Sequence, residues 1–166
     1  MTLTMKHTST LWQLVLAVCA LATIVACGEP DVYNSYVALP NTGWGQDSLT
    51  VFRVDIADNN QPYDISFQIR NQSFYKYANL WLFIDVVSPD GEMQRDTLEC
   101  ILANNDGSWI GAGWGSLYSL QCPYRTNTRF AKIGQYTFRV GHGMRDTDIR
   151  GIHSLGLKIS KNHGQE

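Results

Sequence analysis

Three residues in the C-terminal third of the chain have the types that nucleophilic catalysis uses. His142 could act as a base, Asp146 could orient it, and Ser154 could supply the hydroxyl nucleophile. No nucleophile-elbow sequence surrounds Ser154, and residues of these three types occur close together by chance in many chains. We therefore predict structural or surface roles for them and a protein without enzymatic activity.

The same segment holds groups that could bind a metal ion. Asp146 and Asp148 could supply carboxylate oxygens, and His153 could supply a ring nitrogen. Their spacing fits neither a zinc site nor the loop of an EF-hand. No pair of carboxylates stands out as a glycosidase couple either. We therefore predict solvated loop residues here, with no bound metal and no cofactor.

The segment from Gly107 to Tyr118, GSWIGAGWGSLY, is the most unusual in the chain because its aromatic residues stand among four glycines. The side chains of Trp109, Trp114 and Tyr118 could stack on a sugar ring or on a partner protein. Alternatively, a bulged hairpin could place its tryptophans in the core, where tryptophan is usually found. Trp44, flanked by two glycines, is a further candidate to which the same two interpretations apply.

The first 26 residues predict a signal peptide that does not belong to the fold. Lys6 gives a basic start, and the uncharged run from Leu11 to Ala26 is shorter than the roughly 20 residues that span a bilayer. The run ends in Ile-Val-Ala-Cys, which resembles the bacterial lipobox, so Cys27 is the expected site of lipidation. Acyl chains on Cys27 would hold the mature protein on a membrane. Residues 27–48 are then the lipidated N-terminus, a tether and a lead-in segment.

Two further cysteines remain in the mature chain after cleavage. In the oxidising compartment of an exported protein, such a pair more often forms a disulfide than a metal site or a nucleophile. We therefore predict a disulfide between Cys100 and Cys122, with two buried free thiols as the alternative.

The charge balance excludes one class of partner. Thirteen Lys and Arg against fifteen Asp and Glu give a formal net charge of −2. Proteins that bind phosphate backbones need a basic surplus, so we predict no nucleic-acid partner. The hydrophobic fraction of 44% indicates a folded body.

Short strands with turns between them dominate the rest of the chain. Apolar and polar residues alternate with period two over residues 52–56, 63–70, 136–140 and 155–159. The run LWLFIDVV, residues 80–87, is almost continuously apolar and predicts a strand buried on both faces. The turn sequence Ser-Pro-Asp-Gly follows it and predicts a hairpin with a returning strand over residues 95–102.

No window of helical length shows an apolar stripe with the 3.6-residue period of a helix. The pattern predicts an all-β fold, a single antiparallel β-sandwich that is immunoglobulin-like or jelly-roll-like. We place this domain at residues 49–161, followed by a short tail at residues 162–166.

The most specific resemblance lies between Gly134 and Leu157. The stretches GQYTFRV (134–140) and HGMRD (142–146), with the glycines after them, resemble the gliding motility-associated lipoprotein family GldH of the Bacteroidota. The lipobox and the segments YDISFQIRN and LWLFIDVVSPDG are also similar to that family, so the resemblance covers nearly the whole mature chain.

This resemblance implies a lipoprotein of the cell envelope that is lipid-anchored to a membrane. It implies association with the gliding motility apparatus and, in some species, with type IX secretion, and it implies no catalytic residues. Envelope proteins of that machinery are then the expected partners. Arg145, at the start of a loop, could bind such a partner or hydrogen-bond the carbonyls of a neighbouring loop. The leading hypothesis is a non-enzymatic scaffold component, and the alternative is a carbohydrate-binding surface lipoprotein that uses its loop tryptophans.

Two short segments match the O-glycosylation pattern of that phylum, in which Asp precedes a hydroxyl residue and an aliphatic residue follows it. They are Asp-Ser-Leu at residues 47–49 and Asp-Thr-Leu at residues 96–98. Ser48 and Thr97 are therefore candidate glycosylation sites.

Overall fold

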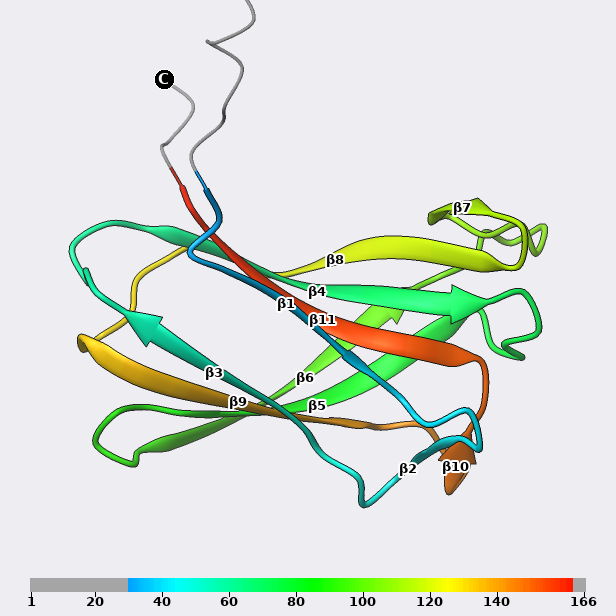
Figure 1. Cartoon of the computed structure of the whole chain (residues 1–166), viewed down its shortest axis with the longest axis horizontal. Coiled ribbons are helices and arrows are strands. Elements are labelled where there is room, and N and C mark those ends of the chain that lie inside the picture. Colours follow the sequence, from blue (N-terminus) through cyan, green and yellow to red (C-terminus); the bar gives the residue numbers. More distant parts are fainter. Residues whose placement is uncertain (1–29, 163–166) are drawn as a thin grey trace, which may run out of the picture. The chain divides into compact units, whose positions relative to one another are not determined.

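The computed structural model describes residues 30–162; the predicted signal peptide, Cys27 and residues 163–166 lie outside this part of the chain. The strands belong to one folded unit that begins at Asp31. They are antiparallel and form two main sheets that pack face to face (Figure 1). The predicted all-β sandwich is confirmed.

One sheet has five strands in the order β1-β11-β4-β8-β7. Its members are β1 (Tyr33–Ala38), β4 (Tyr63–Gln72), β7 (Ala112–Trp114), β8 (Leu117–Thr128) and β11 (Ile152–Lys161). The other sheet has four strands in the order β3-β9-β5-β6. Its members are β3 (Thr50–Ile56), β5 (Asn79–Val87), β6 (Met93–Ile101) and β9 (Gly134–His142). A short ribbon of β2 (Trp44–Gly45) and β10 (Asp148–Ile149) lies at one end of the sandwich.

The core forms because apolar residues alternate along the inner faces of the two sheets. In β3, Phe52, Val54 and Ile56 are buried while Arg53 and Asp55 face solvent. The inner residues of β4, β9 and β11 follow the same alternation. Each large apolar side chain that leaves water in this way contributes about 1.5–3 kcal/mol.

Strand β1 lies outside the domain boundary predicted from the sequence. It pairs with β11 along its whole length, from Tyr33 opposite Ile159 to Ala38 opposite Ser154. The sandwich therefore begins earlier than residue 49, and residues 33–38 are an edge strand rather than a tether. The apolar pattern of this strand is weak because an edge strand buries only part of its surface.

Strand β5 differs from the prediction of a strand buried on both faces. Leu80, Leu82 and Ile84 are buried, but Trp81 and Phe83 are exposed on the outer face of the four-stranded sheet. The prediction was wrong because the sandwich has only two layers. Among the described residues no further layer covers that face.

A hairpin turn and a disulfide agree with the predictions from the sequence. The turn over residues 88–91 joins β5 to β6 in a hairpin, as predicted. Cys100 and Cys122 form the predicted disulfide, with their Cα atoms 5.9 Å apart. This bond ties β6 to β8 and so links the two sheets along one side. Closing a loop of this size stabilises a fold by roughly 3 kcal/mol.

The two ends of the sandwich differ in the segments that they carry. At the end where β1 begins, Tyr63 pairs with Lys161 and Thr128. We call this the near end; it carries the turns at residues 57–62, 88–92 and 129–133. We call the opposite end the far end. It carries the loops at residues 73–78, 102–111 and 143–147, the tip of the β7–β8 hairpin and the β2–β10 ribbon.

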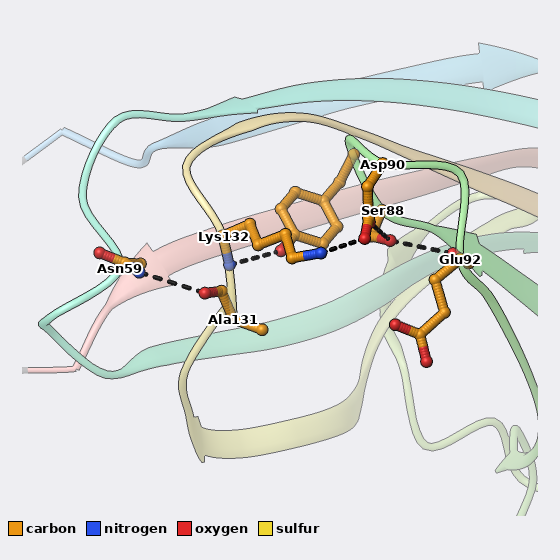
Figure 2. Close-up of polar contacts among 7 residues, drawn as sticks. Asn59, Ser88, Asp90, Glu92, Ala131 and Lys132 are labelled. Carbon is orange, nitrogen blue, oxygen red and sulfur yellow. Dashed lines mark hydrogen bonds and ion pairs between the residues drawn. The ribbon is translucent and has the colours of Figure 1, made fainter.

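Polar contacts fasten the three turns of the near end to one another (Figure 2). The Asn59 side chain donates a hydrogen bond of 3.2 Å to the carbonyl of Ala131. The next residue, Lys132, forms an ion pair with Asp90 in the β5–β6 turn. Its backbone N–H also donates to the Tyr136 hydroxyl at 3.0 Å. Each turn therefore holds a neighbour in place.

Candidate interaction surface

The five binding residues predicted from the sequence all lie at or beside the far end. Trp114 and Tyr118 belong to the β7–β8 hairpin, Trp109 to the loop before it, Trp44 to β2 and Arg145 to the loop after β9. Strand β4 has ten residues. At about 3.3 Å per residue it separates this end from the near end by roughly 30 Å. The far end is therefore presented away from the point where the chain enters the domain.

Trp114 stands free at the tip of the β7–β8 hairpin. Its side chain is 97% exposed. Trp114 pairs with Leu117 across a turn in which Gly115 has φ +67°, a conformation that glycine adopts without strain. The hairpin geometry therefore keeps this indole out of the core.

A second exposed aromatic residue lies on a loop joined to this tip. The backbone N–H of Ser73 donates a hydrogen bond of 2.8 Å to the carbonyl of Ser116. This bond fastens the tip to the β4–β5 loop, where Phe74 is 64% exposed. Two large apolar side chains thus stand in water on loops that are joined by their backbones.

Trp109 takes part in a row of aromatic rings. Its ring centroid lies 5.8 Å from that of Tyr118 and 6.5 Å from that of Tyr75, with tilted ring planes. Trp109 is partly buried against the core. Tyr75 is buried, and burial raises the pKa of its hydroxyl, which donates to the Asn79 carbonyl at 3.0 Å. The row supports the floor of the far end and does not form a free stacking platform.

Trp44 is part of the core, so its predicted role as an exposed stacking residue is corrected. Only 1% of its side chain is exposed. The indole N–H donates to the Ser48 carbonyl at 2.8 Å, and the ring packs edge-on against His142 with centroids 5.4 Å apart. Burial removes its large apolar surface from water, and the carbonyl satisfies its one polar atom.

The loop that contains the HGMRD stretch is clamped onto the start of β5. The backbone N–H of Gly143 donates to the Trp81 carbonyl at 2.7 Å, and the Trp81 N–H lies 3.4 Å from the Met144 sulfur. A Cβ on Gly143 would lie 2.9 Å from the Phe83 ring, so a larger residue at this position would push that ring aside.

Arg145 extends from this loop beside an apolar groove of about 420 Å³. Trp81, Phe83 and Met144 are among the residues that line the groove. Within residues 30–162 the Arg145 guanidinium makes no ion pair and no side-chain hydrogen bond. The neighbouring Asp146 pairs with Lys76 at 2.7 Å, and this ammonium group holds the pKa of Asp146 below its usual range. Arg145 is therefore free to meet an acceptor from outside the domain.

The possible catalytic residues do not assemble into a site. His142 is only 1% exposed, and its two ring nitrogens have no hydrogen-bond partner in the described part of the chain. They lie near the backbone of Trp44 and Thr147, but outside hydrogen-bond geometry. Burial lowers the pKa of His142 below its usual value of 6.5. The Ser154 hydroxyl is also buried without a partner, so no base contacts this hydroxyl.

The possible metal ligands do not gather either. Among the residues that the structure describes, no three His, Cys, Asp or Glu side chains lie close enough together to hold a metal ion. Asp146, Asp148 and His153 therefore form no donor set. Ser48 and Thr97 are both exposed, as sites of O-glycosylation must be.

Three aromatic residues of this region were not predicted from the sequence. Phe74, Trp81 and Phe83 are exposed but were not predicted as binding residues. A signal for two of them was present, because the apolar run of β5 places Trp81 and Phe83 at alternate positions, opposite the strictly aliphatic Leu80, Leu82 and Ile84. Phe74 lies in a loop and carries no such periodic signal.

Comparison with known proteins identifies the family. A model of the GldH lipoprotein family matches residues 31–159. This chain belongs to the GldH lipoprotein family. The match covers nearly the whole sandwich, from two residues before β1 to two residues before the end of β11.

Two relatives from gliding-motility families are similar over most of their length. The gliding motility lipoprotein GldH homolog of Christiangramia forsetii is 32% identical over 143 residues, which cover 82% of this chain and 87% of the relative. The gliding motility lipoprotein GldH of Flavobacterium johnsoniae is 24% identical over 149 residues, which cover 86% of this chain and 92% of the relative. The GldH proteins are thus lipoproteins of the cell envelope, anchored to a membrane.

One solved structure is similar in part. The arabinose-bound α-L-arabinofuranosidase MgGH51 matches with a TM-score of 0.37 and 10% identity, over 76% of this chain and 19% of the enzyme. A likeness this weak carries no argument about activity. Among residues 30–162 no helix has the length and apolar character needed to cross a bilayer.

Proposed function

We propose that this GldH protein is a non-enzymatic docking subunit of the gliding motility apparatus and, in hosts that have one, of the type IX secretion machinery. The names of its relatives support the gliding role. Lipid on Cys27 would hold the domain at an envelope membrane. Envelope proteins of that machinery are the proposed partners, and the far end is the proposed docking surface.

The exposed Trp114 is the observation that carries this proposal. An indole that is 97% exposed adds nothing to the core, yet the hairpin that bears it is hydrogen-bonded to a neighbouring loop. Tryptophan, tyrosine and arginine are the residues most often found at the energetic centre of protein interfaces. Trp114 and Arg145 are of these types, and within residues 30–162 the Arg145 guanidinium makes no ion pair. The exposed Phe74 adds a further large apolar side chain to the far end.

The carbohydrate-binding alternative keeps one supporting observation, the same exposed indole. Trp44 is buried and Trp109 is half-buried, so neither of them is a free platform beside Trp114 on which a sugar chain could stack. Docking of a protein is therefore better supported, since a single aromatic anchor that enters a pocket suffices for it.

The test replaces the anchor and measures the partners. Tagged full-length protein is purified from solubilised envelope, and the proteins that accompany it are quantified by mass spectrometry. Trp114→Ala is expected to lower the yield of its principal envelope partners about tenfold or more, as loss of an interface hot spot does. In a host that glides, colony spreading is expected to fall with it.

Ile133→Ala is the matched control because Ile133 is an exposed apolar residue at the near end. It should leave partner yields unchanged. Wild-type yields with a folded Trp114→Ala variant would contradict the docking proposal. The sugar-binding alternative would be favoured by a different result. In that case the Trp114→Ala variant keeps its partner proteins but is slowed less than the wild type in native gels that contain envelope polysaccharide.

The covalent predictions are tested together by the mass of the mature protein. We expect cleavage before Cys27, a diacylglyceryl group on its thiol and an acyl chain on its amine. Hexose-sized increments on Ser48 or Thr97 would establish O-glycosylation. An uncleaved or unmodified N-terminus would contradict the anchor, and a single mass without increments would contradict the glycosylation.

A further inference from the structure

Strand β3 has one unpaired edge. It pairs with β9 from Thr50 opposite Val140 to Ile56 opposite Gly134. On its other side, no backbone hydrogen bond joins β3 to any segment among the described residues. Every second residue of β3 therefore offers a free N–H and a free carbonyl, which is a template for another strand.

The opposite edge of the same sheet, β6, is protected in ways that β3 is not. Asp96 of β6 points between the sheets, where Tyr124 and Arg125 bind its carboxylate at 3.1 and 3.2 Å. The disulfide of Cys100 ties β6 to β8. An inward charge and a covalent link both discourage pairing with a further strand. Strand β3 has no proline, no lysine, no inward charge and no register shift.

The outer face of β3 carries one charge of each sign, and neither belongs to an ion pair. Arg53 and Asp55 are exposed and lie two residues apart on that face. Within residues 30–162 Arg53 has no ion-pair partner, and Asp55 accepts only a hydrogen bond of 3.2 Å from Gln135. This pattern is complementary to itself when the strand is reversed.

We propose that β3 pairs antiparallel with β3 of a second copy of this chain, around a two-fold axis at Val54. In this register Arg53 of each copy lies opposite Asp55 of the other, which gives two cross-strand ion pairs. On the inner face, Phe52 of each copy lies opposite Ile56 of the other. The two four-stranded sheets become one continuous sheet across the dimer.

Other registers are disfavoured by the same residues. A shift by one residue would place inward side chains opposite outward ones. A symmetric pairing centred on Arg53 would place two guanidinium groups opposite each other, and like charges in that position destabilise a sheet. The self-complementary charges therefore favour the register centred on Val54.

Exposed apolar residues beside this edge support a second copy. Leu49 and Val51 are exposed at the start of β3, and Val37 is exposed at the end of β1. They line a groove of about 300 Å³ between the two strands, together with Leu39 and Pro40. In the proposed register, Val51 lies opposite Ala57 of the second copy, so the dimer covers part of this apolar surface.

The test uses charge reversal and restoration. Two differently tagged full-length copies are expressed together, and one is captured from solubilised envelope while the other is quantified. Arg53→Asp alone and Asp55→Arg alone each place like charges opposite one another, and we expect about a tenfold or greater loss of the second copy. The double variant Arg53→Asp with Asp55→Arg restores opposite charges and is expected to restore capture.

Thr97→Lys on the outer face of β6 and Trp114→Ala at the far end are the controls, and both should leave capture at the wild-type level. The proposed function rests on Trp114, so Trp114→Ala distinguishes loss of partner docking from loss of the dimer. Unchanged capture in both single variants would overturn the proposal. A double variant that folds, by its circular dichroism, but does not regain capture would also overturn it, since a different partner would then use this edge.

Discussion

The two ends of the sandwich differ in the contacts that hold their loops and in the side chains that they expose. The near end joins its turns with polar contacts, namely the Asn59–Ala131 hydrogen bond, the Lys132–Asp90 ion pair and the bond from Lys132 to Tyr136 (Figure 2). The far end is built from aromatic rings and leaves one of its tryptophans, Trp114, in water. Polar fastening holds a turn in place, whereas an exposed apolar surface gains stability only when another molecule covers it.

Within the far end, one tryptophan is part of the core and another is exposed to solvent. Trp44 and Trp114 are the same residue type at the same end, yet one is 1% exposed and the other 97%. Trp44 stabilises the fold, while Trp114 is available to a partner. Exposure therefore differs between individual side chains of one end as well as between the two ends.

The largest effect is expected from a comparison of substitutions at Trp44 and Trp114. Trp44→Ala removes a buried aromatic side chain and is expected to lower the free energy of unfolding by about 3–5 kcal/mol. Trp114→Ala removes an exposed one and should change it by less than about 0.5 kcal/mol. Denaturant unfolding followed by circular dichroism measures both. Equal losses for the two variants would mean that Trp114 packs within the fold.

A smaller effect is expected from acidification, and it should begin at the far end. Burial holds the pKa of His142 below 6.5 in the folded protein, so the unfolded chain binds this proton more tightly. Its contribution to stability is present above pH 6.5 and is lost as the pH falls through the lower folded value. At the near end, Lys132 and Ser88 hold the pKa of Asp90 down at about 2, so that ion pair persists to much lower pH.

Hydrogen exchange at pH 7 and pH 5 measures this difference. Amides of the β2–β10 ribbon and the end of β9 are expected to lose protection first, while those at residues 129–133 keep theirs. His142→Phe should flatten this pH dependence because it removes the titrating group. His153→Gln, which alters an exposed histidine, is the control and should leave the dependence as in the wild type. Simultaneous loss of protection at both ends would contradict the assignment to His142.

Much of the fold could be predicted because its signals are local. Inward Phe52, Val54 and Ile56 alternate with outward residues, and the Ser-Pro-Asp-Gly turn marks a hairpin. The disulfide could be predicted because the predicted cleavage before Cys27 leaves only two other cysteines in the chain. Strand β1 could not, because its place in the sheet depends on β11, which lies more than a hundred residues later in the chain.

The amino-acid sequence by itself thus determined the strands β3, β4, β5, β6, β9 and β11, the disulfide, the family and the expected anchor at Cys27. Only the tertiary structure decided which tryptophan is buried, that His142 and Ser154 do not meet, and that Trp81 and Phe83 face solvent. Among the residues that the structure describes, it also left β3 with a free edge beside Arg53 and Asp55, which belong to no ion pair. The reason is physical: alternation along a strand is set by neighbouring residues, but exposure depends on whether a distant segment covers that face.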